Sequence, residues 1–197
     1  MPPDQAAGLR RRCAALTLLS PRREAACELA AALGATGARV LVVVECGARD
    51  KVSPLFDWRS LLARGGLPGV ADGACERIAA PGCAAGEPAL LDAARGWHWL
   101  VFDGGWPLAL PLAGLDQRFV IEAAAPPTWR QAYAYASSLW RLGARIDLVG
   151  EGADAACDAA LRFHGVALPA NAHFAALAAR MTENHREDLS GIRRVSA

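Results

Sequence analysis

Lysine is almost absent from this chain: Lys51 is the only lysine among 197 residues, and arginine supplies the other basic side chains. A large net charge is also lacking, because acidic and basic side chains leave a formal charge of +1 at pH 7. We therefore do not expect the strongly positive surface of a typical nucleic-acid-binding protein. No apolar run reaches the roughly 18 residues that a membrane-spanning helix needs, so the sequence predicts no membrane span.

Signals for secretion and for metal binding are missing as well. The apolar residues 13–19 follow three arginines, but Ser20-Pro21-Arg22-Arg23 stands where a signal peptide has its small-residue cleavage site. The six cysteines include no C-x-x-C pair, and the four histidines do not lie at zinc-ligand spacing from them. The sequence thus predicts a cytoplasmic protein with reduced, mostly buried thiols and no metal site.

Hydrophobic residues make up 53% of the chain and follow two alternating patterns. Continuous apolar segments predict buried strands at residues 13–19, 40–44, 99–102, 119–122 and 146–149. Helical periodicity predicts helices at 22–34, 54–64, 70–78, 89–95, 128–142, 154–163 and 172–185, with a loop at 79–88. This alternation predicts an α/β fold, a three-layer sandwich around a mostly parallel central sheet. We expect a flexible segment at 1–12, one domain at 13–189 and a loose tail at 190–197.

Polar residues gather where the predicted strands end, which is where open parallel sheets bind ligands. The residues at these ends are Ser20, Pro21, Arg22, Arg23, Glu45, Asp103 and Glu122. Two glycines follow Asp103, which suits an aspartate that holds Mg²⁺ through water in a nucleotide hydrolase. A carboxylate in this position can equally cap neighbouring backbone N–H groups, and the sequence leaves both readings open.

A set of segments, in this order along the chain, resembles a known family. The segments are Leu18-Leu19-Ser20-Pro21, residues 28–34, residues 37–45, residues 66–73, Trp97-His98-Trp99-Leu100-Val101-Phe102-Asp103, and Pro126-Pro127-Thr128. Together they resemble the ParA/MinD group of deviant Walker P-loop ATPases over about residues 13–165. The resemblance implies a P-loop NTPase-like fold, a Walker B role for Asp103, and a dimerisation face across the former nucleotide site.

The phosphate loop of that group is missing from this chain. Such a loop holds phosphates with the backbone N–H groups of a glycine-rich turn and with one lysine. Neither glycine nor lysine lies between Pro21 and the predicted helix, and arginine there cannot restore the loop geometry. We therefore predict a pseudo-ATPase without enzymatic activity and without a cofactor, neither ATP nor magnesium. The vestigial nucleotide-site positions are Ser20, Pro21, Arg22, Arg23, Glu45 and Asp103.

Aromatic residues provide a second candidate site. Trp106, Trp129 and Tyr133 can form a partner surface if they are exposed, because aromatic side chains are enriched at protein interfaces. Packing in the core is the alternative role for the same residues. The first strand is not followed by a G-x-G-x-x-G motif, and no serine lies in a G-x-S-x-G context, so dinucleotide binding and serine hydrolase activity are not expected.

The leading hypothesis is a non-catalytic regulatory or scaffold protein that acts by binding another protein. The partner would be a related ATPase or an assembly component in a bacterial positioning, secretion, motility, cell-division or cellulose exopolysaccharide system, and a homo- or heterodimer is compatible with the resemblance. One alternative is a nucleotide-binding ATPase switch with a remodelled site that uses Glu45 and Asp103. Another is a RecA-like inactive relative that resembles cell-division inhibitors or proteins of mutagenesis operons.

Overall fold

The centre of the structure is a sheet of seven parallel strands in the order β3-β2-β4-β1-β5-β6-β7. The computed structural model describes residues 14–46, 53–67, 75–81, 88–103, 118–124 and 128–195. The strands are β1 (Ala14–Leu19), β2 (Val40–Cys46), β3 (Cys75–Pro81), β4 (Trp99–Asp103), β5 (Arg118–Glu122), β6 (Arg145–Val149) and β7 (Ala170–Asn171). The helices are α2 (Ala25–Ala35), α3 (Trp58–Ala63), α4 (Pro88–Ala93), the 3-10 helix η1 (Ala94–Gly96), α6 (Thr128–Arg141), α7 (Ala153–His164) and α8 (Phe174–Val195).

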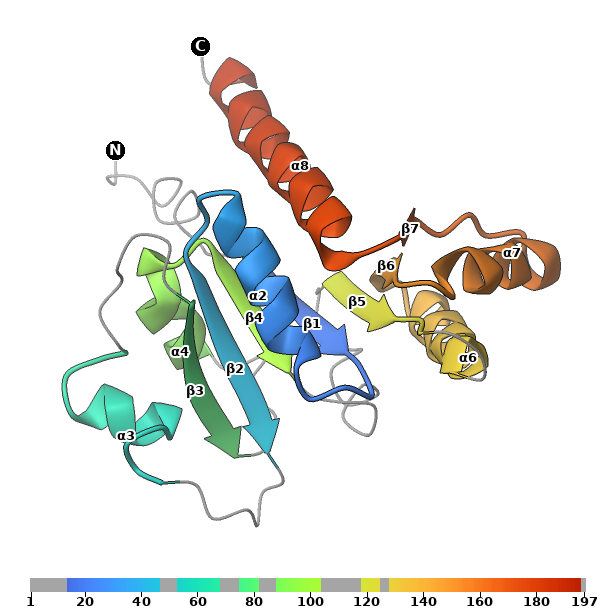
Figure 1. The fold of residues 1–197 in the computed structure, drawn as a ribbon. Coiled ribbons are helices and arrows are strands. Elements are labelled where there is room, and N and C mark those ends of the chain that lie inside the picture. Colours follow the sequence, from blue (N-terminus) through green and yellow to red (C-terminus); the bar gives the residue numbers. More distant parts are fainter. Residues whose placement is uncertain are drawn as a thin grey trace.

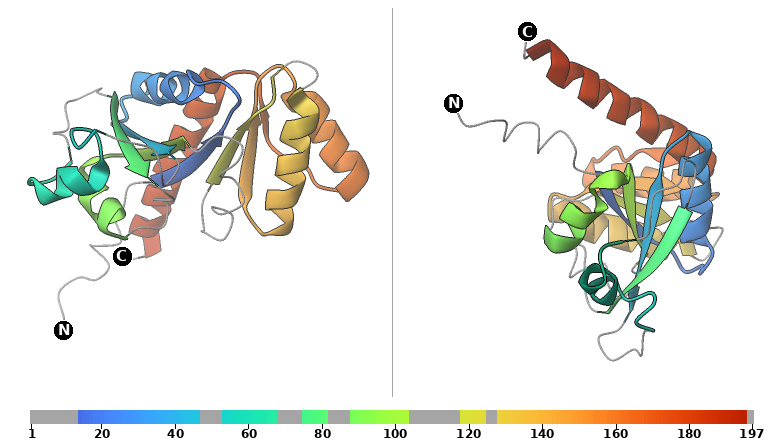
Figure 2. Two further views of the ribbon diagram at one scale, coloured as in Figure 1. Left: turned by 90° about the horizontal axis from the view of Figure 1, so that it is seen from below. Right: turned by 90° about the vertical axis from the view of Figure 1, so that its left-hand side faces the viewer.

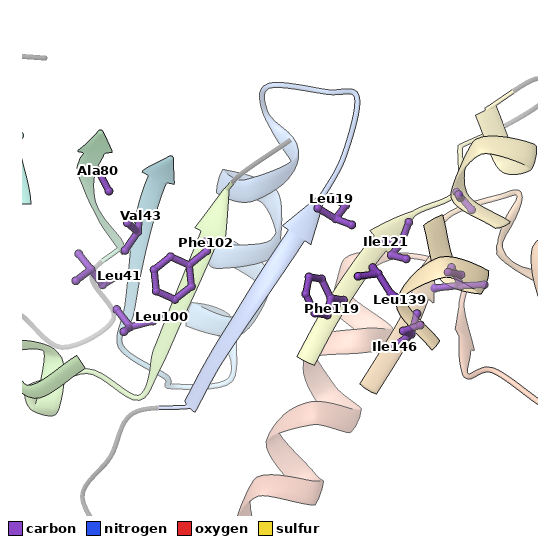
Figure 3. Close-up of a cluster of buried hydrophobic side chains, with 14 of the residues drawn as sticks. Leu19, Leu41, Val43, Ala80, Leu100, Phe102, Phe119, Ile121, Leu139 and Ile146 are labelled. Atoms are coloured by element: carbon purple, nitrogen blue, oxygen red, sulfur yellow. The ribbon is translucent and has the colours of Figure 1, made fainter. Parts of the chain in front are cut away.

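Helices cover both faces of this sheet, which gives the molecule three layers (Figures 1 and 2). One core cluster joins side chains of β1, β2 and β4 to α2 and α8. A second cluster joins other side chains of these strands, and of β5 and β6, to α3, α4, α6 and α7 (Figure 3). Leu18 faces the first cluster and Leu19 the second, because successive side chains of a strand point to opposite faces. The expected α/β three-layer sandwich is thus confirmed.

The strand order reverses at β1. After β1 the chain builds β2 and β3 on one side, returns to place β4 beside β1, and then places β5 on the opposite side. The carboxyl ends of β1, β4 and β5 therefore meet, with Leu18 paired to Asp103 and Leu19 paired to Ile121. Open α/β sheets bind ligands in the crevice just beyond the carboxyl ends of the strands, at the point where the strand order reverses.

The edge strand β3 corrects one expectation. Residues 70–78 were expected to be helical and 79–88 to be a loop, but Cys75–Pro81 is a strand that pairs with β2 along its whole length. Pro88 already belongs to α4, and residues 70–74 and 82–87 lie outside the described residues. The sequence of β3 has one β-branched residue, Ile78, so pairing with β2 rather than local propensity fixes its conformation.

The remaining strand and helix predictions are confirmed with small shifts at their ends, except near the C-terminus. Helix α3 is shorter than the expected 54–64. The short strand β7 was not expected, and α8 runs to Val195, so the backbone of 190–195 is helical rather than loose. Among the described helices, none combines the length and the hydropathy needed to cross a membrane.

Candidate functional site

Ser20 opens the connection between β1 and α2 and is held by hydrogen bonds on both sides. Its Oγ donates a short hydrogen bond to Oε2 of Glu122, the last residue of β5, and accepts one from the backbone N–H of Arg22 at 2.9 Å. This contact follows from the register, because Leu19 pairs with Ile121 and the next residues on each strand are Ser20 and Glu122. Ser20 is buried, so its hydroxyl stabilises the connection and is not presented to a substrate.

The guanidinium of Arg22 lies between two carboxylates. Its Nε donates to Oε1 of Glu122 at 2.7 Å, and its Nη1 and Nη2 donate to the two carboxylate oxygens of Glu28 at 2.8 and 2.7 Å. Such a two-pronged pair uses the planar fork of arginine and is stronger than a single hydrogen bond. The Glu122 side chain is 7% exposed and that of Arg22 is 40% exposed, so the network closes over a buried carboxylate. We call Ser20, Arg22, Glu28 and Glu122 the Arg22 network.

The pKa values of the network agree with its geometry. The hydrogen bonds that Arg22 donates to Glu28 and Glu122 raise the pKa of Arg22, and burial only partly opposes them. The hydrogen bond from Arg22 lowers the pKa of Glu28 below its ordinary value, against a smaller opposing effect of burial. Both members of this pair therefore stay charged at neutral pH.

Two glutamates of the network place negative charge near the N-terminus of α2. Helix α2 begins at Ala25 with no side-chain cap, and Glu28 lies in its first turn. A negative charge in this position is favourable because the helix dipole and the free N–H groups are positive there. Glu28 supplies that charge, and Glu122 supplies a second one at the end of β5. The guanidinium of Arg22 thus already has two intramolecular carboxylate partners.

A cleft of about 390 Å³ lies beside the Arg22 network. Its lining residues are Arg22, Glu28, Glu122, Ala124, Val149, Gly150, Glu151, Ala172, His173 and Phe174. One arginine and three glutamates give this lining a net charge of −2 when His173 is neutral. We call it the switch-point cleft, because it lies where the strand order reverses. Its charge suits a cationic group and opposes an anionic one.

Asp103 and Glu45 lie on the other side of β1, at the ends of β4 and β2. Burial raises the pKa of Asp103, and the charge of Arg77 on β3 partly opposes that effect. Glu45 is buried near the end of β2. Within the described part of the chain, no hydrogen bond or ion pair connects Asp103 with Ser20 or Arg22.

The predicted vestigial positions therefore fall into three groups. Ser20 and Arg22 meet in the network. Pro21 and Arg23 are exposed in the same connection between β1 and α2, and Glu45 and Asp103 lie on neighbouring strands. The predicted vestigial positions did not include Glu28 or Glu122, although Glu122 was among the polar residues at the predicted strand ends. Glu122 ends a buried strand next to β1, but only the pairing of β5 with β1 reveals that it meets Arg22.

The three aromatic residues of the predicted partner surface do not form one exposed group among the described residues. Trp106 lies outside the described residues. Trp129 and Tyr133 of α6 are half-buried and pack against the core cluster under that helix. The hydroxyl of Tyr133 lies 3.1 Å from Nε2 of His164, and their rings stack at 5.9 Å between centroids. Tyr133 thus joins α6 to α7 as well as reaching the surface.

Neither a protein-family model nor a curated protein matches this chain. Among the described residues, no three histidine, cysteine, aspartate or glutamate side chains converge to hold a metal ion.

Proposed function

We propose that this chain is a non-catalytic regulatory or scaffold protein with a ParA/MinD-like fold that acts by binding another protein. The observation that supports the proposal is the Arg22 network, in which Glu28 and Glu122 take the place of phosphate oxygens. An enzyme of this type needs a positive, open site at the end of its first strand. Here that site is filled by the chain's own carboxylates.

Electrostatics oppose nucleotide binding in this cleft. A triphosphate reaching Arg22 would have to displace Glu28 and leave Glu122, which is 7% exposed, without its cationic partner. A buried carboxylate deprived of its partner costs several kcal/mol. The net charge of −2 in the cleft adds repulsion against an anion. We expect neither ATP nor magnesium to bind here.

The same charge points to the kind of group that a protein partner would offer. Glu151 is exposed at the edge of the cleft and belongs to no ion pair within the described residues. An arginine or lysine of a partner can enter the cleft and pair with Glu151 without breaking the Arg22 network. The partner class is the one expected above: a related ATPase or an assembly component of a bacterial positioning, secretion, motility, cell-division or cellulose export system.

Titration with a fluorescent ATP analogue in the presence of Mg²⁺ tests the loss of nucleotide binding. We expect no saturable binding at analogue concentrations up to about 1 mM. A dissociation constant of about 1 mM corresponds to a binding free energy of about −4 kcal/mol. Saturable micromolar binding accompanied by phosphate release would contradict the proposal and favour a nucleotide switch.

Affinity purification from the native cell, with identification of captured proteins by mass spectrometry, tests the binding role. We expect a protein captured by the natural chain to be lost with Glu151→Lys and retained with Asp154→Lys. Asp154 is a matched control, since it is also exposed near the start of α7 but does not line the cleft. Equal capture by both variants would show that the cleft is not the binding surface.

A further inference from the structure

His173 stands directly before α8 and caps the start of that helix. Its carbonyl oxygen accepts a hydrogen bond from the backbone N–H of Leu177 at 3.2 Å. Its Nδ1 accepts another from the backbone N–H of Ala176, the third residue of α8, at 3.1 Å. These two contacts are those of an N-cap residue. Serine, threonine, aspartate and asparagine are the usual residues there, so histidine gives this cap a titratable acceptor.

The hydrogen bond from Ala176 requires a neutral imidazole. Nδ1 accepts it only while its lone pair is free, which places the ring proton on Nε2. Protonation turns Nδ1 into a second donor, so the imidazolium and the N–H of Ala176 then repel each other. The N-terminus of α8 is positive as well and disfavours a cation at that place. A histidine cap is therefore sensitive to acid, whereas an asparagine cap is not.

Glu151 is the carboxylate that is placed to receive the imidazolium. Glu151 and His173 line the same cleft. The backbone N–H of Gly150 donates to the carbonyl oxygen of Asn171 at 2.9 Å, so each of the two side chains lies within two residues of one backbone contact. Glu151 is exposed and forms no ion pair with any other described residue. Glutamate is still mostly ionised at about pH 5, where histidine has gained its proton.

The other charged groups that face His173 already have partners. Those that line the cleft with it are Arg22 from the β1–α2 connection, Glu28 from α2 and Glu122 from β5. They bind one another in the Arg22 network. On α8 itself the first turn has no acidic residue, and Arg180 in the second turn is bound to Asp147 of β6. Glu151 is thus the carboxylate of this cleft that is open to the imidazolium.

The cap also holds one wall of the cleft in place. Ala172, His173 and Phe174 follow one another in the chain and all line the cleft. Phe174 is the first residue of α8 and packs in the core cluster that α8 shares with α2 and the sheet. A helix that loses its cap leaves the N–H groups of its first turn without a partner, and this turn frays more readily. The charge state of His173 therefore affects both the charge of the cleft and the order of its wall.

We propose that His173 is a pH-sensitive cap that changes the switch-point cleft. The neutral ring caps α8 and leaves Glu151 open to a cationic group. The imidazolium leaves the N–H of Ala176 and pairs with Glu151, and the added proton changes the net charge of the lining from −2 to −1. Acid thereby fills the position that a cationic group of a partner would take. That last consequence rests on the proposed function, whereas the cap itself concerns this chain alone.

Nuclear magnetic resonance of the natural chain between about pH 8 and about pH 5 tests the cap. At the upper pH, the ring ¹⁵N resonances of His173 should show a proton on Nε2 and none on Nδ1. As Nδ1 gains its proton, the protection of the Ala176 amide against hydrogen exchange should fall about fivefold, the factor that a typical cap contributes. His173→Asn should keep this protection at both pH values, because asparagine caps helices without titrating. His173→Ala should lack it at both.

Glu151→Gln tests the second half of the proposal. Without this carboxylate, half loss of the cap should need a pH lower by about 0.5 unit, the effect of an exposed ion pair. Asp154→Asn is the matched control, since it removes one exposed carboxylate near the start of α7 but outside the cleft lining. It should leave the pH profile unchanged.

Three results would overturn the proposal. They are a proton on Nδ1 of His173 at about pH 8, protection of Ala176 that does not change with pH in the natural chain, and equal pH profiles for Glu151→Gln and Asp154→Asn. These measurements need no partner. Their failure is therefore distinguishable from failure of the proposed function, which the affinity purification tests.

Discussion

At the scale of single residues, Arg22 determines the character of the cleft. Its guanidinium holds a buried glutamate from β5 and an exposed one from α2, and it thereby fixes the connection between β1 and α2. Within the described residues, Glu122 has two side-chain partners, Ser20 and Arg22. Removal of the guanidinium would leave a nearly buried carboxylate with one neutral partner.

Arg22→Ala should therefore destabilise the protein by about 2 kcal/mol. Breaking a buried ion pair costs more than this, but Arg22 is 40% exposed and water replaces part of the lost interaction. Urea denaturation at pH 7 measures the change in the free energy of unfolding. Arg23→Ala removes the neighbouring exposed arginine and should cost less than about 0.5 kcal/mol. Equal losses for the two variants would show that the network adds no stability.

Substitutions of Asp103 distinguish the proposed non-catalytic function from the alternative of a nucleotide switch. Burial raises the pKa of Asp103 in the folded state, so ionisation of this carboxyl destabilises the fold. The loss of folding free energy is absent below the pKa of the unfolded chain and grows as pH rises through the pKa of the folded state. Asp103→Asn should therefore be more stable than the natural chain at pH 7 and equally stable near pH 3, as measured by thermal unfolding. An aspartate kept for magnesium would instead show loss of nucleotide affinity in Asp103→Ala without loss of folding.

At the scale of elements, the strands that are buried on both faces could be predicted from the sequence, whereas the edge strand β3 could not. Segments such as Val40-Leu41-Val42-Val43-Val44 are continuously apolar because α2 and the helices of the other face both cover them. Strand β3 has alanine, glutamate and arginine in its sequence and depends on β2 for its conformation, so its residues suggested a helix. The site was predictable as a position on the sheet. The contacts of Glu122 in the site could not be predicted, because Arg22 and Ser20 lie 100 and 102 positions away from it in the sequence.

The start of α7 gives a prediction of its own. A Cβ on Gly152 would lie 2.5 Å from the carbonyl oxygen of Ala124 and 2.7 Å from Cβ of Trp129. Gly152→Ala should thus push α7 away from α6 and cost about 2 kcal/mol, measured by chemical denaturation. Gly165→Ala at the other end of α7 meets nothing within 4 Å and pays only for its φ of +66°, about 1 kcal/mol. A larger loss at Gly165 than at Gly152 would contradict this packing.

At the scale of the whole molecule, the cleft beside β1 and the outer surface of α7 differ in chemical character. We expect the negative lining of the cleft to oppose anions, whereas the outer surface of α7 presents the exposed apolar side chains of Leu161 and Phe163. The two surfaces share no lining residue, although Glu151 of the cleft lies two residues before α7.

The central place of β1 also has a consequence for biosynthesis. This strand leaves the ribosome before the other described strands, yet its neighbours β4 and β5 begin at residues 99 and 118, and β2 does not pair with it in the sheet. A nascent chain that ends before Trp99 contains β1, β2 and β3 but not the strand that joins them. Such intermediates expose apolar strands and are prone to aggregate. Chaperone dependence during translation should accordingly end only when β4 and β5 have emerged.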